Sequence, residues 1–167
     1  KNISSRELAQ LPGRGLDAIG YREENGCFNI LLGEAKVSGQ KKSPPDVVDV
    51  TQDSICKTHK KHSEDVSMII RKLTDYCRKL GAKDLIPFSC AILYMQAGNT
   101  NKYSLTFGCT LIRDYTCCGE NDFGKMQTDV EYFKPNDVHF VVLSFTQKTI
   151  AETVELFYKE IRKSINQ

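Results

Sequence analysis

The chain has 167 residues, a formal net charge of +2 at pH 7 and 40% hydrophobic residues. We assign residues 1–167 to a single domain, and the composition excludes collagen-like and disordered classes. The small net charge does not by itself indicate a polyanionic partner, so a case for nucleic acid must rest on local clusters of charge. Because the sequence begins with Lys rather than Met, we expect N-terminal elements of the full-length protein to be missing.

Cellular location is inferred from apolar runs and cysteines. No run approaches the ~20 apolar residues of a membrane span, and no signal peptide opens the chain. The cysteine number is odd, no C-x-x-C occurs, and neither cysteines nor histidines are spaced as zinc ligands. We therefore expect reduced, structural thiols and a cytoplasmic protein. The seven cysteines are Cys27, Cys56, Cys77, Cys90, Cys109, Cys117 and Cys118.

The first part of the chain predicts a hairpin. A short helix over Ile3–Gln10 comes first, followed by a strand over Leu16–Tyr21. Glu24-Asn25-Gly26 provides turn residues, and Asn-Gly is the strongest short-range hairpin signal. A second strand, Cys27–Val37, follows the turn, so we expect the two strands to pair antiparallel.

The remaining chain predicts a mixed α/β fold. Helical periodicity covers Val50–Leu80, as one helix or two, and Phe88–Met95 is predicted as an apolar strand. Tyr103–Asp114 and Val138–Phe145 are two further strand candidates, and Thr149–Glu152 has the pattern of a capping box that begins a last helix. This order indicates one central sheet flanked by helices.

The chemistry-bearing segment is the predicted hairpin. Glu34 and Lys36 follow an apolar strand two residues apart, so their side chains share one face. Burying charges there is costly without a partner or a metal ion. An even register, or one bulge, would bring Asp17 to that face as well. Two carboxylates and an ammonium suit Mg²⁺-assisted phosphodiester hydrolysis, in which Lys36 orients the attacking water or neutralises developing charge.

The pattern Gly-x-Asp, a hairpin turn and Gly-Glu-Ala-Lys resembles the PD-(D/E)xK, or restriction-endonuclease-like, nuclease superfamily. The resemblance implies a mixed central sheet flanked by helices and a metal site made by Asp17, Glu34 and the backbone of Ala35. It also implies Lys36 as the catalytic lysine and Mg²⁺ as the cofactor, for which Mn²⁺ substitutes. Gln52 follows the motif as in RecB-like members, but Cys56 stands where those members have an aromatic residue.

A finer resemblance concerns two sequence segments, Gly-Leu-Asp-Ala-Ile-Gly at residues 15–20 and Leu-Gly-Glu-Ala-Lys at residues 32–36. They are similar to the nuclease subunit of the Hachiman anti-phage system. This implies a DNA endonuclease in bacterial anti-phage defence, with a helicase or another defence subunit as its partner.

Basic residues near the motif are candidates for contact with DNA phosphates. The alternative is that they form an ordinary solvated surface. Two alternatives to an enzyme also stay open: a catalytically silent module that binds nucleic acid or docks to a partner, and a structural domain in which Glu34 and Lys36 merely pair. The candidate DNA-binding residues are Arg14, Lys41, Lys42, Lys57, Lys60 and Lys61.

Overall fold

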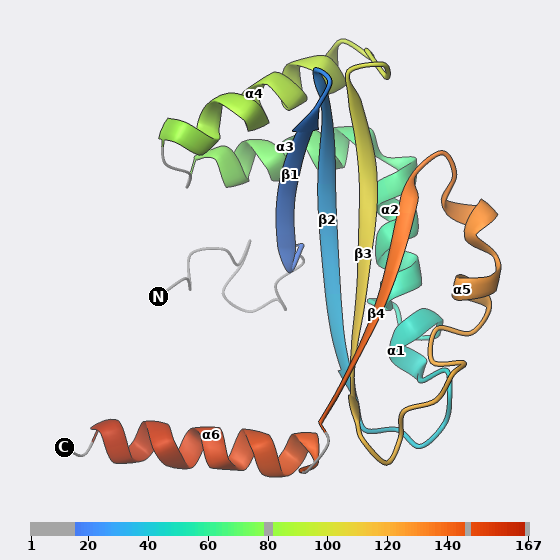
Figure 1. Ribbon diagram of the computed structural model, residues 1–167, viewed down its shortest axis with the longest axis vertical. Coiled ribbons are helices and arrows are strands. Elements are labelled where there is room, and N and C mark those ends of the chain that lie inside the picture. Colours follow the sequence, from blue (N-terminus) through green and yellow to red (C-terminus); the bar gives the residue numbers. More distant parts are fainter. Residues whose placement is uncertain (1–15, 79–81, 146–147, 166–167) are drawn as a thin grey trace.

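The computed structural model describes residues 16–78, 82–145 and 148–165, which form a mixed α/β structure around one four-stranded sheet (Figure 1). The strand order is β1-β2-β3-β4; β1 pairs antiparallel with β2, whereas β2–β3 and β3–β4 are parallel. The predicted mixed central sheet with helices is therefore confirmed. The strands are β1 (Ala18–Glu24), β2 (Cys27–Ser38), β3 (Tyr103–Asp114) and β4 (Asp137–Phe145).

Parallel strands need a crossover connection, and helices supply it here. Among the described residues, four helices lie between β2 and β3, two short elements lie between β3 and β4, and a last helix follows β4 (Figure 1). The helices are α1 (Asp46–Asp49), α2 (Ile55–Glu64), α3 (Val66–Cys77), α4 (Ala82–Gln96), α5 (Lys125–Thr128), the 3₁₀ helix η2 (Val130–Phe133) and α6 (Ile150–Ile165).

The β1–β2 hairpin forms as predicted, with its first strand displaced toward the turn. Asn25 and Gly26 have φ values of 53° and 71°, the left-handed pair that a two-residue type I′ turn requires. The turn fixes the register of the two strands. Glu24 pairs with Cys27 next to the turn, and Ala18, six residues earlier in the chain, pairs with Gly33. The predicted helix over Ile3–Gln10 lies outside the described residues.

The Val50–Leu80 pattern forms two helices within the described residues. Asp65 has φ −129° and ψ 83°, which ends α2, and its side chain accepts a hydrogen bond from the Met68 N–H at 2.9 Å. This N-cap begins α3. Ser54 caps α2 in the same way, through the N–H of Lys57.

The strand predicted over Phe88–Met95 is wrong, because these residues belong to α4. Phe88, Ala91 and Met95 are buried, and their spacing of three and four residues is that of a helix face. Ile86 and Leu93 are also apolar but exposed, so the segment lacks the polar face that would have revealed its period. A short apolar run of this kind fits a buried strand equally well.

The two faces of the sheet differ in what covers them. Phe28, Ile30 and Leu32 of β2 are buried in a core that includes Val48 of α1, Ile55 of α2, Ile69 and Leu73 of α3, and Phe88 of α4. We call this side the helix face. Side chains of the opposite side, the open face, include four exposed apolar residues: Leu31, Val37, Val141 and Leu143.

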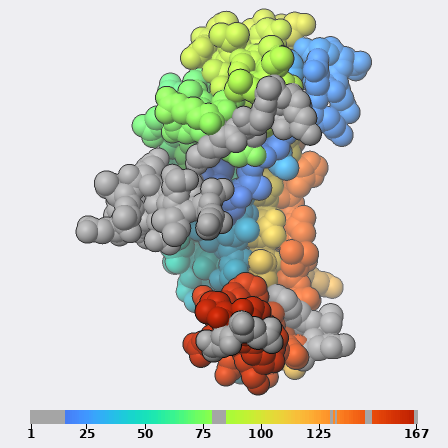
Figure 2. Space-filling model, turned by 90° about the vertical axis from the view of Figure 1, so that its left-hand side faces the viewer, coloured from blue at the N-terminus to red at the C-terminus, as the bar shows by residue number. Residues whose placement is uncertain are grey.

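The last helix begins at the predicted capping box. Thr149 Oγ1 accepts from the Glu152 N–H at 3.2 Å, while the Glu152 carboxylate accepts from the Thr149 N–H at 2.7 Å. Beyond this cap α6 runs out from one end of the sheet (Figure 1), and in Figure 2 its red atoms lie at the bottom of the molecule. Val154, Phe157 and Ile161, spaced along one face, are exposed.

A buried arginine ties together the loops at one end of the sheet. Arg113 of β3 has no exposed surface, and its Nε lies 3.4 Å from Asp122 Oδ2. Its guanidinium also donates to the carbonyls of Ser38 (3.1 Å), Lys42 (3.0 Å) and Cys117 (2.6 Å). The loop after β2 and the loop after β3 therefore share one anchor.

Replacing this anchor should destabilise the domain strongly. Arg113→Met leaves the Asp122 charge buried without its partner, so we expect the free energy of unfolding to fall by about 3–5 kcal/mol. Urea denaturation followed by circular dichroism measures the loss. Arg78→Ala, which removes an exposed ion pair with Asp75, is the control and should cost about 0–1 kcal/mol. Equal losses in the two variants would contradict this account of Arg113.

Candidate active site

The hairpin register brings Asp17 beside the motif on β2. Asp17 comes one residue before β1 and thus opposite Glu34, because Ala18 pairs with Gly33. Its N–H donates to the Gly33 carbonyl at 3.0 Å, and its Oδ2 accepts from the Ala35 N–H at 2.7 Å. The Asp17 carboxylate is therefore held at the edge of β2 rather than on the open face.

Glu34 and Lys36 form an ion pair on the helix face. Lys36 Nζ lies 3.0 Å from Glu34 Oε1. Glu34 is only 5% exposed, and its second oxygen, Oε2, is buried without a hydrogen-bond partner. An unpartnered carboxylate oxygen in the interior is costly, so this atom is where a further cationic or hydrogen-bonding group would be most stabilising.

Asp53 is a member of the site that the sequence analysis missed. Its Oδ2 lies 3.2 Å from Lys36 Nζ, so that the ammonium stands between the carboxylates of Glu34 and Asp53. Asp53 lies in the turn between α1 and α2, directly before the N-cap residue Ser54. The only signal in the sequence was its place next to Gln52, a residue noted for its position after the motif.

Lys72 of α3 is a second residue near the site, and the sequence predicted it to be ordinary surface. It is half-buried, and its charge acts on both Glu34 and His62. Its position on an amphipathic helix pointed to ordinary surface. The packing of α3 over the helix face instead brings this cation into the electrostatic field of the site.

The protonation equilibria reflect these neighbours. Burial raises the pKa of Glu34; the charge of Asp17 also raises it, while Lys36 and Lys72 oppose the rise. Burial by itself would lower the pKa of Lys36, but the ion pairs with Glu34 and Asp53 outweigh it and raise this pKa. The contact with Lys36 lowers the pKa of Asp53. The site therefore favours a charged lysine between two acids.

The backbone of Ala35 also faces the site. The Phe28 N–H donates to Lys102 on the β3 side, so alternate residues of β2, including Ala35, direct their N–H and C=O groups toward β1. At Ala35, however, β1 has not yet begun, and the Asp17 side chain takes the N–H. The same alternation directs the Ala35 carbonyl to this edge, which no strand among the described residues covers.

These groups fit a hard divalent cation. Within the described residues, no group of three or more His, Cys, Asp or Glu side chains is placed to hold a metal ion. Two carboxylates, a backbone carbonyl and water molecules are nevertheless a donor set that Mg²⁺ accepts, since it keeps several waters and takes few protein ligands. The buried, unpartnered Glu34 Oε2 supports the fit.

The predicted DNA-binding lysines lie after the motif, and Lys42, Lys57 and Lys60 have contacts of their own. Lys42 pairs with Asp46, Lys57 Nζ donates to the Val50 carbonyl at 2.7 Å, and Lys60 lies 3.8 Å from Glu64. Lys41 and Lys61 are exposed. Arg14 lies outside the described residues. Contact of this group with nucleic acid stays a prediction.

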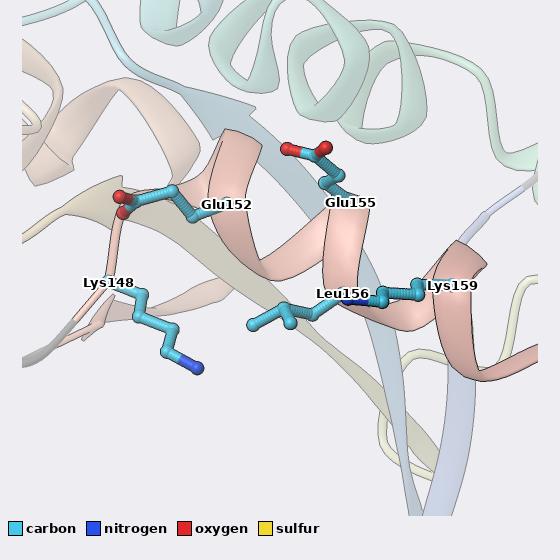
Figure 3. Close-up of a pocket in the computed structure, with 5 residues that line it drawn as sticks. All are labelled: Lys148, Glu152, Glu155, Leu156 and Lys159. Atoms are coloured by element: carbon cyan, nitrogen blue, oxygen red, sulfur yellow. The ribbon is translucent and has the colours of Figure 1, made fainter.

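Two surface hollows lie apart from Asp17, Glu34 and Lys36. One, of about 340 Å³, is bordered by Lys148, Glu152, Glu155, Leu156 and Lys159 beside α6 (Figure 3). Its mixture of acidic and basic side chains gives no field of one sign for a polyanion. The other, of about 390 Å³, lies over β1–β4 and includes Asn29, Thr106 and His139.

Comparison with known proteins assigns the family. The model of the HamA family matches residues 7–161, which is most of the chain. The chain belongs to the HamA family. HamA is a component of the Hachiman anti-phage defence system, so the resemblance to a Hachiman subunit is confirmed at the level of the family. Searches of curated proteins and of solved structures gave no match.

Membership of the HamA family also implies other subunits of the defence system as partners. Among the described residues, no helix is both long enough and apolar enough to cross a bilayer.

The catalytic roles of Asp17, Glu34 and Lys36, and the ligand role of Ala35, stay predictions.

Helix α2 contributes two buried histidines to the interior of the domain. His59 Nε2 lies 3.3 Å from the Gly108 carbonyl, and its ring lies 4.8 Å from that of Phe107, centroid to centroid. His62 lies 6.0 Å from His59 by the same measure. Burial lowers the pKa of His59 to about 4 and that of His62 to about 3. Both rings are therefore neutral parts of the core at neutral pH.

Acidification should consequently destabilise the domain. Unfolded histidines take up protons below their ordinary pKa of about 6.5, while the folded rings resist protonation down to the lower values. Stability is thus fully present above about pH 6.5 and falls toward pH 4, by at most about 1.4 kcal/mol per pH unit for each histidine. Urea denaturation at several pH values measures the slope of the free energy of unfolding against pH.

The control for this experiment is the exposed His139 of β4. His62→Leu should reduce the slope, whereas His139→Gln should leave it at the wild-type value. A slope that is the same in all three proteins would mean that the buried histidines do not cause it.

Proposed function

We propose that this HamA domain is a Mg²⁺-dependent nuclease that hydrolyses phosphodiester bonds of DNA in anti-phage defence, and that Mn²⁺ substitutes for Mg²⁺. The observation that carries the proposal is the meeting of Asp17, Glu34 and Lys36, with Glu34 Oε2 buried and unpartnered. An incidental surface ion pair would leave both carboxylate oxygens in water. Here the pair is set into the helix face, where a charge needs compensation.

Each residue has a separate task in this proposal. Asp17, Glu34 and the Ala35 carbonyl would hold the divalent ion at the open edge of β2. When bound, the ion supplies positive charge for substrate phosphate oxygens and makes a nearby water more acidic. Lys36 holds an ammonium beside Glu34, where it orients the attacking water and neutralises charge that develops in the transition state. Resemblance to the PD-(D/E)xK superfamily implies direct attack of water, leaving a 5′-phosphate and a 3′-hydroxyl.

Cleavage of plasmid and single-stranded DNA with Mg²⁺ or Mn²⁺ tests the proposal. We expect Asp17→Asn and Lys36→Ala each to lower the cleavage rate by about 100-fold or more, the usual cost of losing a group that stabilises the transition state. Lys163→Ala, in an exposed ion pair of α6, is the matched control and should cleave at the wild-type rate. Full activity in Asp17→Asn or Lys36→Ala would refute the assignment of the site.

Calorimetric titration with Mn²⁺ accompanies this assay, because loss of activity alone does not separate binding from chemistry. Asp17→Asn should weaken Mn²⁺ binding, whereas Lys36→Ala should leave it present. Binding that does not depend on Asp17 or Glu34 would support a structural role for the pair of Glu34 and Lys36.

The loop lysines generate a separate prediction about DNA affinity. Lys41→Ala combined with Lys42→Ala should weaken DNA binding uniformly across sequences. It should also reduce the slope of log affinity against log salt by about 1 for each phosphate contact that is lost. Fluorescence anisotropy at several salt concentrations, with DNA of two unrelated sequences, measures both effects. An unchanged salt slope would show that these lysines are ordinary solvated surface.

A second candidate function is that of a silent module within a Hachiman complex, with a helicase or another defence subunit as the partner. The specific observation in its favour is the exposed apolar row of α6, which includes Val154, Phe157 and Ile161. Exposed apolar rows of this kind are common at protein–protein interfaces. Salt-dependent DNA binding without cleavage, measured side by side in the two assays above, would favour this function over the nuclease.

A further inference from the structure

Asp53 reaches the site from a turn that is held firmly at both ends. Before it, the Val50 and Thr51 N–H groups donate to the Asp46 carbonyl at 2.9 and 3.0 Å. After it, the buried Ser54 donates its N–H to the Thr51 carbonyl at 3.1 Å and caps α2. The side chain of Asp53 therefore starts from a fixed backbone position, although it is itself 81% exposed.

Glu34 alone does not fix the position of the Lys36 ammonium, and Asp53 provides a second hydrogen-bond acceptor. A lysine ammonium is a compact charge on a flexible four-carbon stem, so one hydrogen-bond acceptor does not fix its direction. Glu34 is also the carboxylate that a divalent cation would engage, and a cation there would repel the neighbouring ammonium. Asp53, whose Oδ2 lies 3.2 Å from Lys36 Nζ, is a second acceptor that lies outside the proposed set of metal ligands.

We propose that Asp53 is a positioning residue, which holds the Lys36 ammonium in its working place when Glu34 is engaged by a divalent cation. This inference rests on the nuclease function proposed above. It adds to the site a residue from another element, 17 positions after Lys36 in the chain. Asp53 touches neither the ion nor the phosphate in this arrangement and acts only through Lys36.

The exposure of Asp53 makes the inference testable without unfolding the domain. An ion pair with one largely exposed partner adds little to stability. Asp53→Asn keeps the shape of the side chain and removes its charge, so its melting temperature should match that of the wild type. Asp53→Glu keeps the charge. Asp49→Asn, at an exposed position in α1, changes a neighbouring acid and is the control.

Steady-state cleavage in Mg²⁺ gives the first measurement. We expect Asp53→Asn to lower kcat about 10-fold with KM within about twofold of the wild type, since a misplaced catalytic group slows chemistry rather than binding. Asp53→Glu should recover most of kcat, and Asp49→Asn should keep all of it. An Asp53→Asn protein with unchanged or higher kcat overturns the inference, as does a loss confined to KM.

Nuclear magnetic resonance of the lysine ¹⁵Nζ groups gives a second measurement, which needs no activity. The Lys36 signal should shift or broaden in Asp53→Asn and stay unchanged in Asp49→Asn. If the wild-type protein cleaves no DNA, the nuclease proposal fails, and this comparison still decides whether Asp53 holds Lys36. A Lys36 signal that is the same in all three proteins overturns the inference.

Discussion

The register of the β1–β2 hairpin is the constraint on which the site depends. Asn25 and Gly26 take left-handed conformations and form a two-residue turn. This turn fixes which residue of β2 each residue of β1 pairs with, from Glu24 opposite Cys27 to Ala18 opposite Gly33. A slip by one residue would turn each β1 side chain to the other face of the sheet. At Gly33 the strands approach so closely that a Cβ would lie 2.9 Å from that of Ala18, so glycine is needed directly before Glu34. Because β1 begins only at Ala18, no strand among the described residues pairs with this edge of β2 where Asp17 meets Ala35.

As a consequence of this geometry, the Glu34 carboxylate is buried with a partner for only one of its two oxygens. The apolar start of β2 belongs to the core, and the strand carries the same face on to Glu34 and Lys36, so that both charges enter a region with little water. Lys36 compensates one oxygen of Glu34 directly, and Lys72 contributes charge from α3. The remaining oxygen of Glu34 is unpartnered. The fold thus accepts a cost in stability at one point, which is a recurring property of functional sites.

The parts of this arrangement that local patterns determine were predictable from the sequence, and the parts that depend on packing were not. The hairpin follows from Asn-Gly between two strand-like runs, and the common face of Glu34 and Lys36 follows from their spacing. The strand predicted over Phe88–Met95 failed because α4 is apolar on nearly all sides, so its period was hidden. Asp53 escaped notice because a loop residue has no periodicity. Arg113 was missed because its buried partner Asp122 comes from a separate loop that only the folded chain brings near.

The two sides of the sheet carry different groups of residues. Glu34 and Lys36 lie on the helix face, under α1–α3, with Asp17 at the adjoining edge of β2. Leu31, Val37, Val141 and Leu143 are exposed on the opposite face, and α6 leaves the sheet at its end with its apolar row uncovered. A subunit seated on the open face would therefore not lie on the side of the sheet that holds Glu34 and Lys36. The proposed chemistry and the exposed apolar residues therefore lie on different surfaces of the same four strands.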